Sequence, residues 1–340
     1  MVGIDTYTLE PTYLKCSKEE KDVHQILHSS RIVTVEDLTN LSKIKSRRPF
    51  AICGVPLKIK GLLGGPVRMV VIDETGEVID CSHELFNYPE PEYYPEPYTF
   101  TPPISRHWEP TFKPELPSIH SATRLHPFIV EGQGVRGFEH KEAYVTMGGE
   151  HYGCHVEGPF TPPEILVHLW GESHNFSKEL LKKYRRMPLD KMIGEASIVD
   201  LTDQIGPEQE IEVGVLEKAG KHVRKNDIVI INTGYYEWYG ATSHWGTFTP
   251  GFRIEAAEWL VHKEIKTLVV DFPGVDLNKG GYSSNRVHYL FHAHDIPIIE
   301  KVVNLWKMAA KRIFFFALPL PVCAVTAYPT HVIAFEKKST

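Results

Sequence analysis

An internal repeat constrains the architecture of this 340-residue chain more than any other sequence feature. Glu36 follows His24 by twelve residues, and Glu300 follows His288 by the same spacing, so the second pair lies 264 residues after the first. Near-constant register over many positions indicates that residues 1–75 are a partial duplicate of about the last 70 residues. The further matches are Asn40-Leu41 with Asn304-Leu305 at the same offset, and Val55-Pro56-Leu57 with Leu318-Pro319-Leu320 and Pro66 with Pro329 at an offset of 263.

The repeat divides the chain into three predicted parts. Residues 1–75 are the partial copy, residues 76–118 are a linker rich in proline and tyrosine, and residues 119–340 are the complete domain. Prolines recur from Pro89 to Pro117 and interrupt regular elements. The interleaved tyrosines favour a segment that packs on its parent domain, although an extended partner ligand remains an alternative.

Composition excludes several classes of function. Apolar content of 42% and charged content of 24% are typical of a globular protein. The net charge of −6 gives no basic surface for nucleic acid. The sequence shows neither an apolar run long enough to span a membrane nor a secretory signal at its start. Five scattered cysteines without a CxxC pair predict a reducing, cytoplasmic setting.

Alternating helical and strand patterns predict an α/β fold. The apolar runs 227–232 and 267–271 are typical of buried strands, and residues 196–201, 314–320 and 331–335 are further predicted strands. Residues 253–263 form a predicted amphipathic helix, and two more helices are expected at 162–170 and 177–186. A helical signal over 208–219 ends at Gly220.

Two histidines and a carboxylate occupy alternating positions in a glycine-rich stretch, residues 148–159. On an extended strand His151, His155 and Glu157 project to the same side. The glycines and the closing Pro159 argue against a helix. Two imidazoles and a carboxylate on one face are donors of a divalent metal site, although a strand without a ligand fits the stretch equally well. Cys154 should point to the opposite face, which makes it a weak candidate nucleophile.

These segments together resemble the cyclase family of metal-dependent hydrolases, which includes bacterial kynurenine formamidase and isatin hydrolase. The family signature is His-x-Gly-Thr-His-x-Asp-x-Pro, matched here by His151, Gly153, His155, Glu157 and Pro159. The resemblance covers residues 119–336, with a second partial match over 1–75. It continues through residues 227–234, 255–260, 268–271, 288–300 and 318–320. It implies a swivelling β/β/α fold and a homo-oligomer.

The resemblance also implies a ligand set. His151, His155 and Glu157 would hold one divalent metal ion, and His288 and Glu300 would complete the pocket, as ligands of a second ion. Zinc accepts histidine and carboxylate ligands while leaving a position open for water. Manganese tolerates the same set with more oxygen donors.

Two positions depart from the family pattern. Glu157 replaces the family aspartate, and Thr161 stands where a further histidine is expected. A threonine hydroxyl cannot replace imidazole as a proton donor at neutral pH. His168 or His174 would have to substitute. The catalytic candidates are therefore Glu300, Thr161 and His168.

The expected function is metal-dependent hydrolysis of a small amide or lactone, with an arylformamide as the closest family substrate. Glu300 or Glu157 would orient the attacking water or accept its proton. The alternative is a degenerate family member that binds metal without catalysing a reaction. Tyr235, Tyr236, Trp238 and Trp245 either line an aromatic pocket or pack against the core.

Overall fold

The computed structural model describes two compact units of the chain. The N-terminal unit spans residues 1–54, 59–152 and 321–323, and the C-terminal unit spans 55–58, 153–320 and 324–340. Within these bounds the described residues are 1–6, 9, 23–45, 49, 51–56, 65, 67–74, 77–82, 85–86, 127–132, 140–145, 153–158, 188–235, 248–279, 286–323 and 327–336. Among them, no helix is long and apolar enough to cross a membrane.

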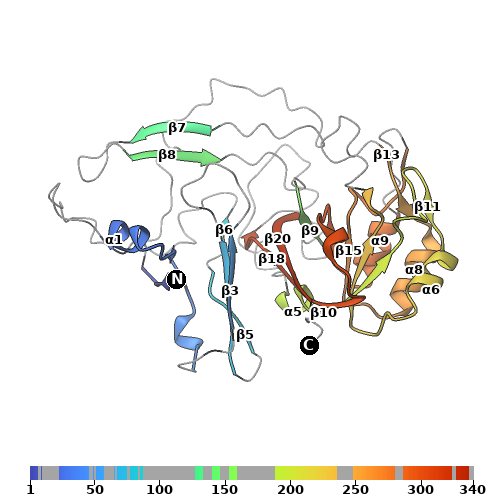
Figure 1. The fold of residues 1–340 in the computed structure, drawn as a ribbon, viewed down its shortest axis with the longest axis horizontal. Coiled ribbons are helices and arrows are strands. Elements are labelled where there is room, and N and C mark those ends of the chain that lie inside the picture. Colours follow the sequence, from blue (N-terminus) through green and yellow to red (C-terminus); the bar gives the residue numbers. More distant parts are fainter. Residues whose placement is uncertain are drawn as a thin grey trace, which may run out of the picture. The chain divides into compact units, whose positions relative to one another are not determined.

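The C-terminal unit is built on a closed barrel (Figure 1). Its strand order is β10-β12-β15-β17-β9-β20-β18, and β18 pairs back with β10. The first four of these strands are parallel, whereas β9, β20 and β18 close the barrel through antiparallel pairs. The strands are β9 (His155–Glu157), β10 (Ile193–Asp200), β12 (Ile228–Asn232), β15 (Thr267–Val270), β17 (Ile298–Glu300), β18 (Arg312–Pro319) and β20 (Ala327–Phe335).

Helices cover one side of the parallel strands (Figure 1). Val229 and Ile231 of β12 join the same apolar cluster as Leu260 of α8 and Phe291 of α9. Ile230 points to the other face of β12 and is equally buried. Burial on both faces explains why this strand reads as a continuous apolar run. The helices and minor elements are α5 (Leu189–Met192), α6 (Val213–Ala219), α8 (Ile254–His262), α9 (Arg286–Ala293), η2 (Leu305–Lys307) and the strand pairs β11 (Glu210–Ile211) with β14 (Gly251–Phe252) and β13 (Phe248–Thr249) with β16 (Asn278–Lys279).

The predicted α/β class is confirmed, and the predicted strands and helix at 196–201, 227–232, 253–263, 267–271, 314–320 and 331–335 correspond to β10, β12, α8, β15, β18 and β20. Gly220 is the C-cap of α6, as its position predicted, although the helix begins only at Val213. The helices expected at 162–170 and 177–186 lie outside the described residues.

The N-terminal unit contains small sheets and one described helix. Strand β1 pairs in parallel with β2, β3-β4-β5 form a sheet, β7 pairs with β8, and β6 pairs with β19. Two of its short strands, β5 and β6, fall in the segment that composition marked as a linker. The elements are β1 (Val2–Gly3), α1 (Val23–Ser29), β2 (Thr34–Val35), η1 (Leu41–Lys43), β3 (Ala51–Pro56), β4 (Val67–Ile72), β5 (Val78–Asp80), β6 (Leu85–Phe86), β7 (Pro127–Gly132), β8 (His140–Val145) and β19 (Val322–Cys323).

Left-handed residues recur in the two units at a constant spacing. Non-glycine residues rarely adopt positive φ, because Cβ then crowds the backbone. Each unit nevertheless has a set of three such residues, and each member lies 264 positions from its counterpart. The pairs are Arg31 with Asp295 (φ 57° and 58°), Asp37 with Lys301 (58° and 59°) and Asn40 with Asn304 (58° and 67°).

Strand register follows the same correspondence. Val2 pairs with Thr34 across β1 and β2, just as Leu268 pairs with Ile298 across β15 and β17. The amides that follow β2 and β17 return to the preceding strand in the same way. The bonds are Asp37 N to Thr6 O and Leu38 N to Ile4 O in one unit, and Lys301 N to Phe272 O and Val302 N to Val270 O in the other.

Candidate metal centre

The short strand β9 positions the first two candidate ligands. His155 and Glu157 are separated by one residue on an extended strand, so both side chains lie on the same face. The backbone of His155 is directly opposite Glu300 of β17, which brings the third side chain to this face. Gly153 has a φ of 65°, which favours glycine, and its carbonyl accepts a hydrogen bond from His155 Nδ1 at 2.9 Å.

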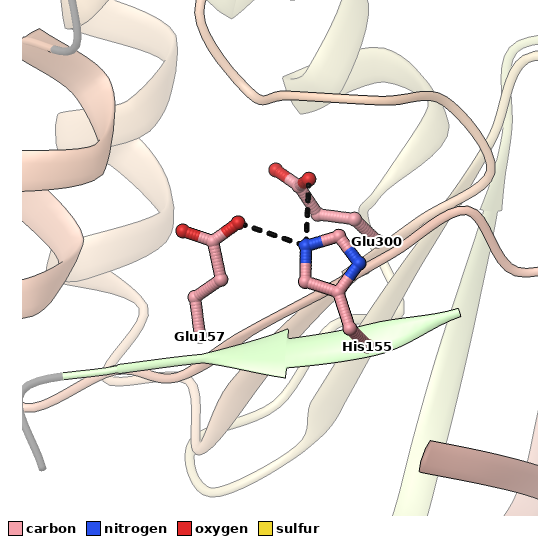
Figure 2. A group of neighbouring side chains, drawn as sticks. All are labelled: His155, Glu157 and Glu300. Atoms are coloured by element: carbon pink, nitrogen blue, oxygen red, sulfur yellow. Dashed lines mark hydrogen bonds and ion pairs between the residues drawn. The ribbon is translucent and has the colours of Figure 1, made fainter. Parts of the chain in front are cut away.

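The two carboxylates converge on His155 (Figure 2). His155 Nε2 lies 3.0 Å from Glu157 Oε1 and 3.4 Å from Glu300 Oε2. All three side chains are buried, with His155 0%, Glu157 8% and Glu300 3% exposed. One atom of each residue lies within 4.8 Å of the others, which is compatible with common ligation of one ion.

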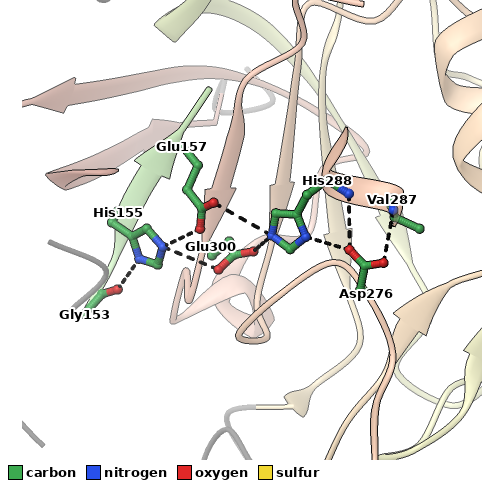
Figure 3. A network of polar contacts seen from close by, with 7 residues as sticks. All are labelled: Gly153, His155, Glu157, Asp276, Val287, His288 and Glu300. Atoms are coloured by element: carbon green, nitrogen blue, oxygen red, sulfur yellow. Dashed lines mark hydrogen bonds and ion pairs between the residues drawn. The ribbon is translucent and has the colours of Figure 1, made fainter. Parts of the chain in front are cut away.

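His288 of α9 approaches the same carboxylates from the other side (Figure 3). Its Nε2 lies 3.3 Å from Glu300 Oε1 and 3.8 Å from Glu157 Oε2. Each carboxylate therefore turns one oxygen toward His155 and its other oxygen toward His288.

Asp276 holds His288 in this orientation (Figure 3). His288 Nδ1 donates to Asp276 Oδ2 at 2.6 Å, and the same carboxylate accepts the backbone amides of Val287 and His288 at 3.0 and 3.2 Å. These amides lie in the first turn of α9, so Asp276 also caps the helix. Because a carboxylate at Nδ1 fixes the tautomer, Nε2 is the nitrogen presented to the site.

The carboxylates stabilise the protonated imidazoles. Burial alone lowers the pKa of His155, but its contacts with Glu157 and Glu300 outweigh burial and raise that pKa to about 9. The pKa of His288 is raised well above its usual range, since the contacts with Asp276 and Glu300 likewise outweigh burial.

The imidazoles in turn keep Glu300 ionised. Burial and the neighbouring Glu157 would raise the pKa of Glu300, yet the contacts with His155 and His288 lower it to about 2. Burial would also raise the pKa of Asp276, but its bond from His288 and the backbone amides keep that pKa low.

The donor set suits a divalent ion. Both Nδ1 atoms are engaged by backbone or carboxylate oxygens, so both Nε2 atoms face the carboxylates. Two adjacent buried carboxylates need positive charge close by, and a divalent cation supplies it where the protonated imidazoles otherwise do. Imidazole nitrogen and carboxylate oxygen are ligands that zinc and manganese both accept.

Four of the predicted site residues come together in the structure: His155, Glu157, His288 and Glu300. The alternation argument for His155 and Glu157 is thereby confirmed at the level of geometry. His151, Thr161, His168 and His174 lie outside the described residues.

Two of the alternative roles considered from sequence are disfavoured by burial. Burial raises the pKa of the Cys154 thiol to about 12, so the thiol remains protonated and is a poor nucleophile at neutral pH. Tyr235 is fully buried in the core and packs there instead of lining a substrate pocket. Tyr236, Trp238 and Trp245 lie outside the described residues.

Two residues near the site were missed by sequence reasoning. Asp276 carried one usable signal: Glu10 stands 266 residues earlier, at the offset that relates Asp5 to Asp271. His292 lies one helical turn after His288, with ring centroids 6.2 Å apart. Burial lowers the pKa of His292 to about 4, and its Nε2 has no hydrogen-bond partner among the described residues.

Several solved structures share parts of this fold. An isatin hydrolase bound to the product analogue thioisatinate has 20% identity and a TM-score of 0.47, covering 62% of this chain and 80% of that one. Isatin hydrolase A from Labrenzia aggregata, bound to benzyl benzoate, has 19% identity and a TM-score of 0.49, covering 64% and 86%. A predicted metal-dependent hydrolase from Bacillus stearothermophilus has 20% identity and a TM-score of 0.43, covering 58% and 82%.

Sequence comparison gives the family directly. No curated protein sequence matches the chain. The sequence model of the family described as "Putative cyclase" matches residues 79–277, more than half of the chain and including β9 with His155 and Glu157. The family resemblance drawn from the histidine motif is thereby confirmed, and the chain belongs to the cyclase family.

Proposed function

We propose that this protein is a metal-dependent hydrolase whose site is formed by His155, Glu157, His288 and Glu300. One observation carries the proposal: two buried carboxylates each turn one oxygen toward each of two imidazole Nε2 atoms. This arrangement offers donors for one ion on the His155 side and for a second on the His288 side. By family resemblance His151, which lies outside the described residues, would be a further ligand. The expected metals are zinc and manganese.

The protein's own groups would bind, orient and accept protons. When bound, a divalent ion polarises a carbonyl oxygen and makes water more acidic. Glu300 or Glu157 would orient the attacking water and accept its proton, because both lie in the buried cluster where that water would stand. Asp276 keeps His288 Nε2 turned toward the carboxylates throughout.

The substrate we propose is a small amide or lactone, and an N-formyl arylamine is the closest guess by family resemblance. An arylamine leaving group needs a proton donor, and Thr161 is a poor one because its hydroxyl has a pKa far above 7. His168 would serve as that donor if the substrate is an amide. A lactone depends less on this proton, so the pair of substrate classes is informative.

The test is an assay of the purified protein on an N-formyl arylamine and on an aromatic lactone, with and without added Zn²⁺ or Mn²⁺. The proposal expects hydrolysis of at least one substrate, its loss after chelation, and its loss in His155→Ala. Metal binding without turnover of either substrate would instead support the alternative, a family member that binds metal without catalysis. Turnover that survives both chelation and His155→Ala would place the chemistry elsewhere.

We propose further that residues 1–75 are a partial duplicate of the C-terminal half of the complete domain, residues 119–340, with residues 76–118 as the linker. The support is the set of left-handed residues at a spacing of 264 and the matching strand register. Three expectations from family and composition remain proposals: the swivelling β/β/α fold, a homo-oligomer, and a reducing cytoplasmic compartment.

A further inference from the structure

The N-terminal unit contains its own histidine–glutamate pair. His24 of α1 and Glu36, which follows β2, bring Nε2 and Oε1 to 3.1 Å. Their counterparts His288 and Glu300 make the same contact at 3.3 Å. Because the backbones around both pairs share their left-handed residues and register, these side chains occupy equivalent places in the two units.

A second histidine accompanies each pair. His28 lies one turn after His24, with ring centroids 5.5 Å apart and ring planes at 72°. The equivalent rings of His288 and His292 are 6.2 Å apart at 76°. His28 Nε2, however, lies 3.2 Å from Thr34 Oγ1, so this imidazole nitrogen is engaged by a neighbouring hydroxyl and does not face Glu36.

The two pairs differ in what surrounds them. His24 and Glu36 side chains are 29% and 28% exposed, whereas those of His288 and Glu300 are 15% and 4% exposed. In the described part of the N-terminal unit β2 pairs only with β1, and no strand takes the place that β9 takes beside β17. Glu36 Oε1 accepts a hydrogen bond from the Leu9 amide at 2.9 Å, which holds the carboxylate in place.

We propose that His24 and Glu36 form a second, weaker site for a divalent transition-metal ion. The inference rests on the proposed function, because it takes His288 and Glu300 to be metal ligands. One imidazole nitrogen and one carboxylate oxygen, held 3.1 Å apart on an ordered backbone, are a preformed half of such a ligand set. Their partial exposure lets water supply the remaining ligands. With two protein ligands and greater hydration, the affinity falls well below that of the buried four-residue site.

The experiment is a Zn²⁺ titration of the full, metal-stripped chain by equilibrium dialysis. Wild-type protein should show a tight class of sites and a separate weak class. His24→Ala and Glu36→Gln should each weaken the weak class about tenfold or more, a change of about 1.4 kcal/mol, and leave the tight class unchanged. His28→Ala is the matched control, since it removes a histidine from the same helix without touching the pair, and it should retain both classes.

The outcomes are separable. A weak class that is absent, that is unchanged in His24→Ala and Glu36→Gln, or that falls equally in His28→Ala overturns this inference and leaves an exposed ion pair. Failure of the proposed function has a different signature: the tight class is missing from the wild-type protein or persists in His155→Ala. Circular dichroism of each variant confirms that α1 is retained.

Discussion

Two histidine–glutamate pairs in this chain share spacing, backbone geometry and contact distance, yet only one of them belongs to a buried site. Around His288 and Glu300, β9 adds His155 and Glu157, and α9 packs against α8. Around His24 and Glu36 the described residues show neither neighbour. The comparison separates what the local sequence determines, which is the pair itself, from what the surrounding fold determines, which is burial and a complete ligand set.

The largest expected effect comes from removing a ligand contributed by β9. His155→Ala should lower hydrolytic activity about a hundredfold or more and abolish tight metal binding, because it removes a buried imidazole between two carboxylates. His24→Ala should leave activity unchanged. Activity assays and metal analysis of both variants provide the measurement, and comparable losses of activity in the two would break the comparison.

A pH titration of the metal-free protein tests the buried charges. The pKa of His155 is raised from 6.5 to about 9, so its stabilisation is complete below pH 6.5 and is lost as pH rises through 9. The pKa of Glu300 is lowered from 4.5 to about 2, so its stabilisation is present above pH 4.5 and is lost as pH falls through 2. The two windows overlap between pH 4.5 and 6.5.

Urea unfolding of the metal-free protein should therefore show a loss on the order of 3 kcal/mol between pH 6.5 and 9. His155→Ala should flatten this alkaline limb. A wild-type profile that is already flat from pH 6.5 to 9 would show that the imidazole is not held by the carboxylates as the structure describes.

The next effect concerns orientation. Asp276→Asn should weaken metal binding or activity about 10- to 100-fold, because an amide no longer fixes the His288 tautomer. Asp203→Asn, an exposed aspartate remote from the cluster, is the control. Metal affinity is measured by competition with a chromophoric chelator. Unchanged affinity and activity in Asp276→Asn would assign this residue to helix capping alone.

The smallest effect tests the difference in packing between the two helices. Val287 of α9 is 3% exposed, whereas its counterpart Val23 of α1 is 41% exposed. Val287→Ala should destabilise the protein by about 2 kcal/mol, and Val23→Ala by about 0.5 kcal/mol or less. Chemical unfolding monitored by circular dichroism measures both, and equal losses would mean that α1 is as deeply packed as α9.

Much of the site could be predicted because its signals are local or repeated. Strand alternation put His155 and Glu157 on one face, and the spacing of twelve residues linked His288 to Glu300. Buried parallel strands are recognisable as apolar runs, so β12 and β15 were found within one residue at each end.

Other features depend on pairings between distant residues. Barrel closure requires β9 to pair with both β17 and β20, and a strand of three residues carries too little periodicity to announce this. Asp276 lies in a loop without a repeating pattern, and its role follows only from where α9 begins. His292 faces the core for the same reason, since helix orientation is set by packing against α8.

Metal analysis of protein purified without chelators tests the central claim most directly. If His155, Glu157, His288 and Glu300 form a metal site, elemental analysis should find between about one and two divalent ions per chain, reduced to background in His155→Ala. Less than about 0.1 ion per chain in the wild-type protein, with none taken up on addition of Zn²⁺ or Mn²⁺, would contradict the account.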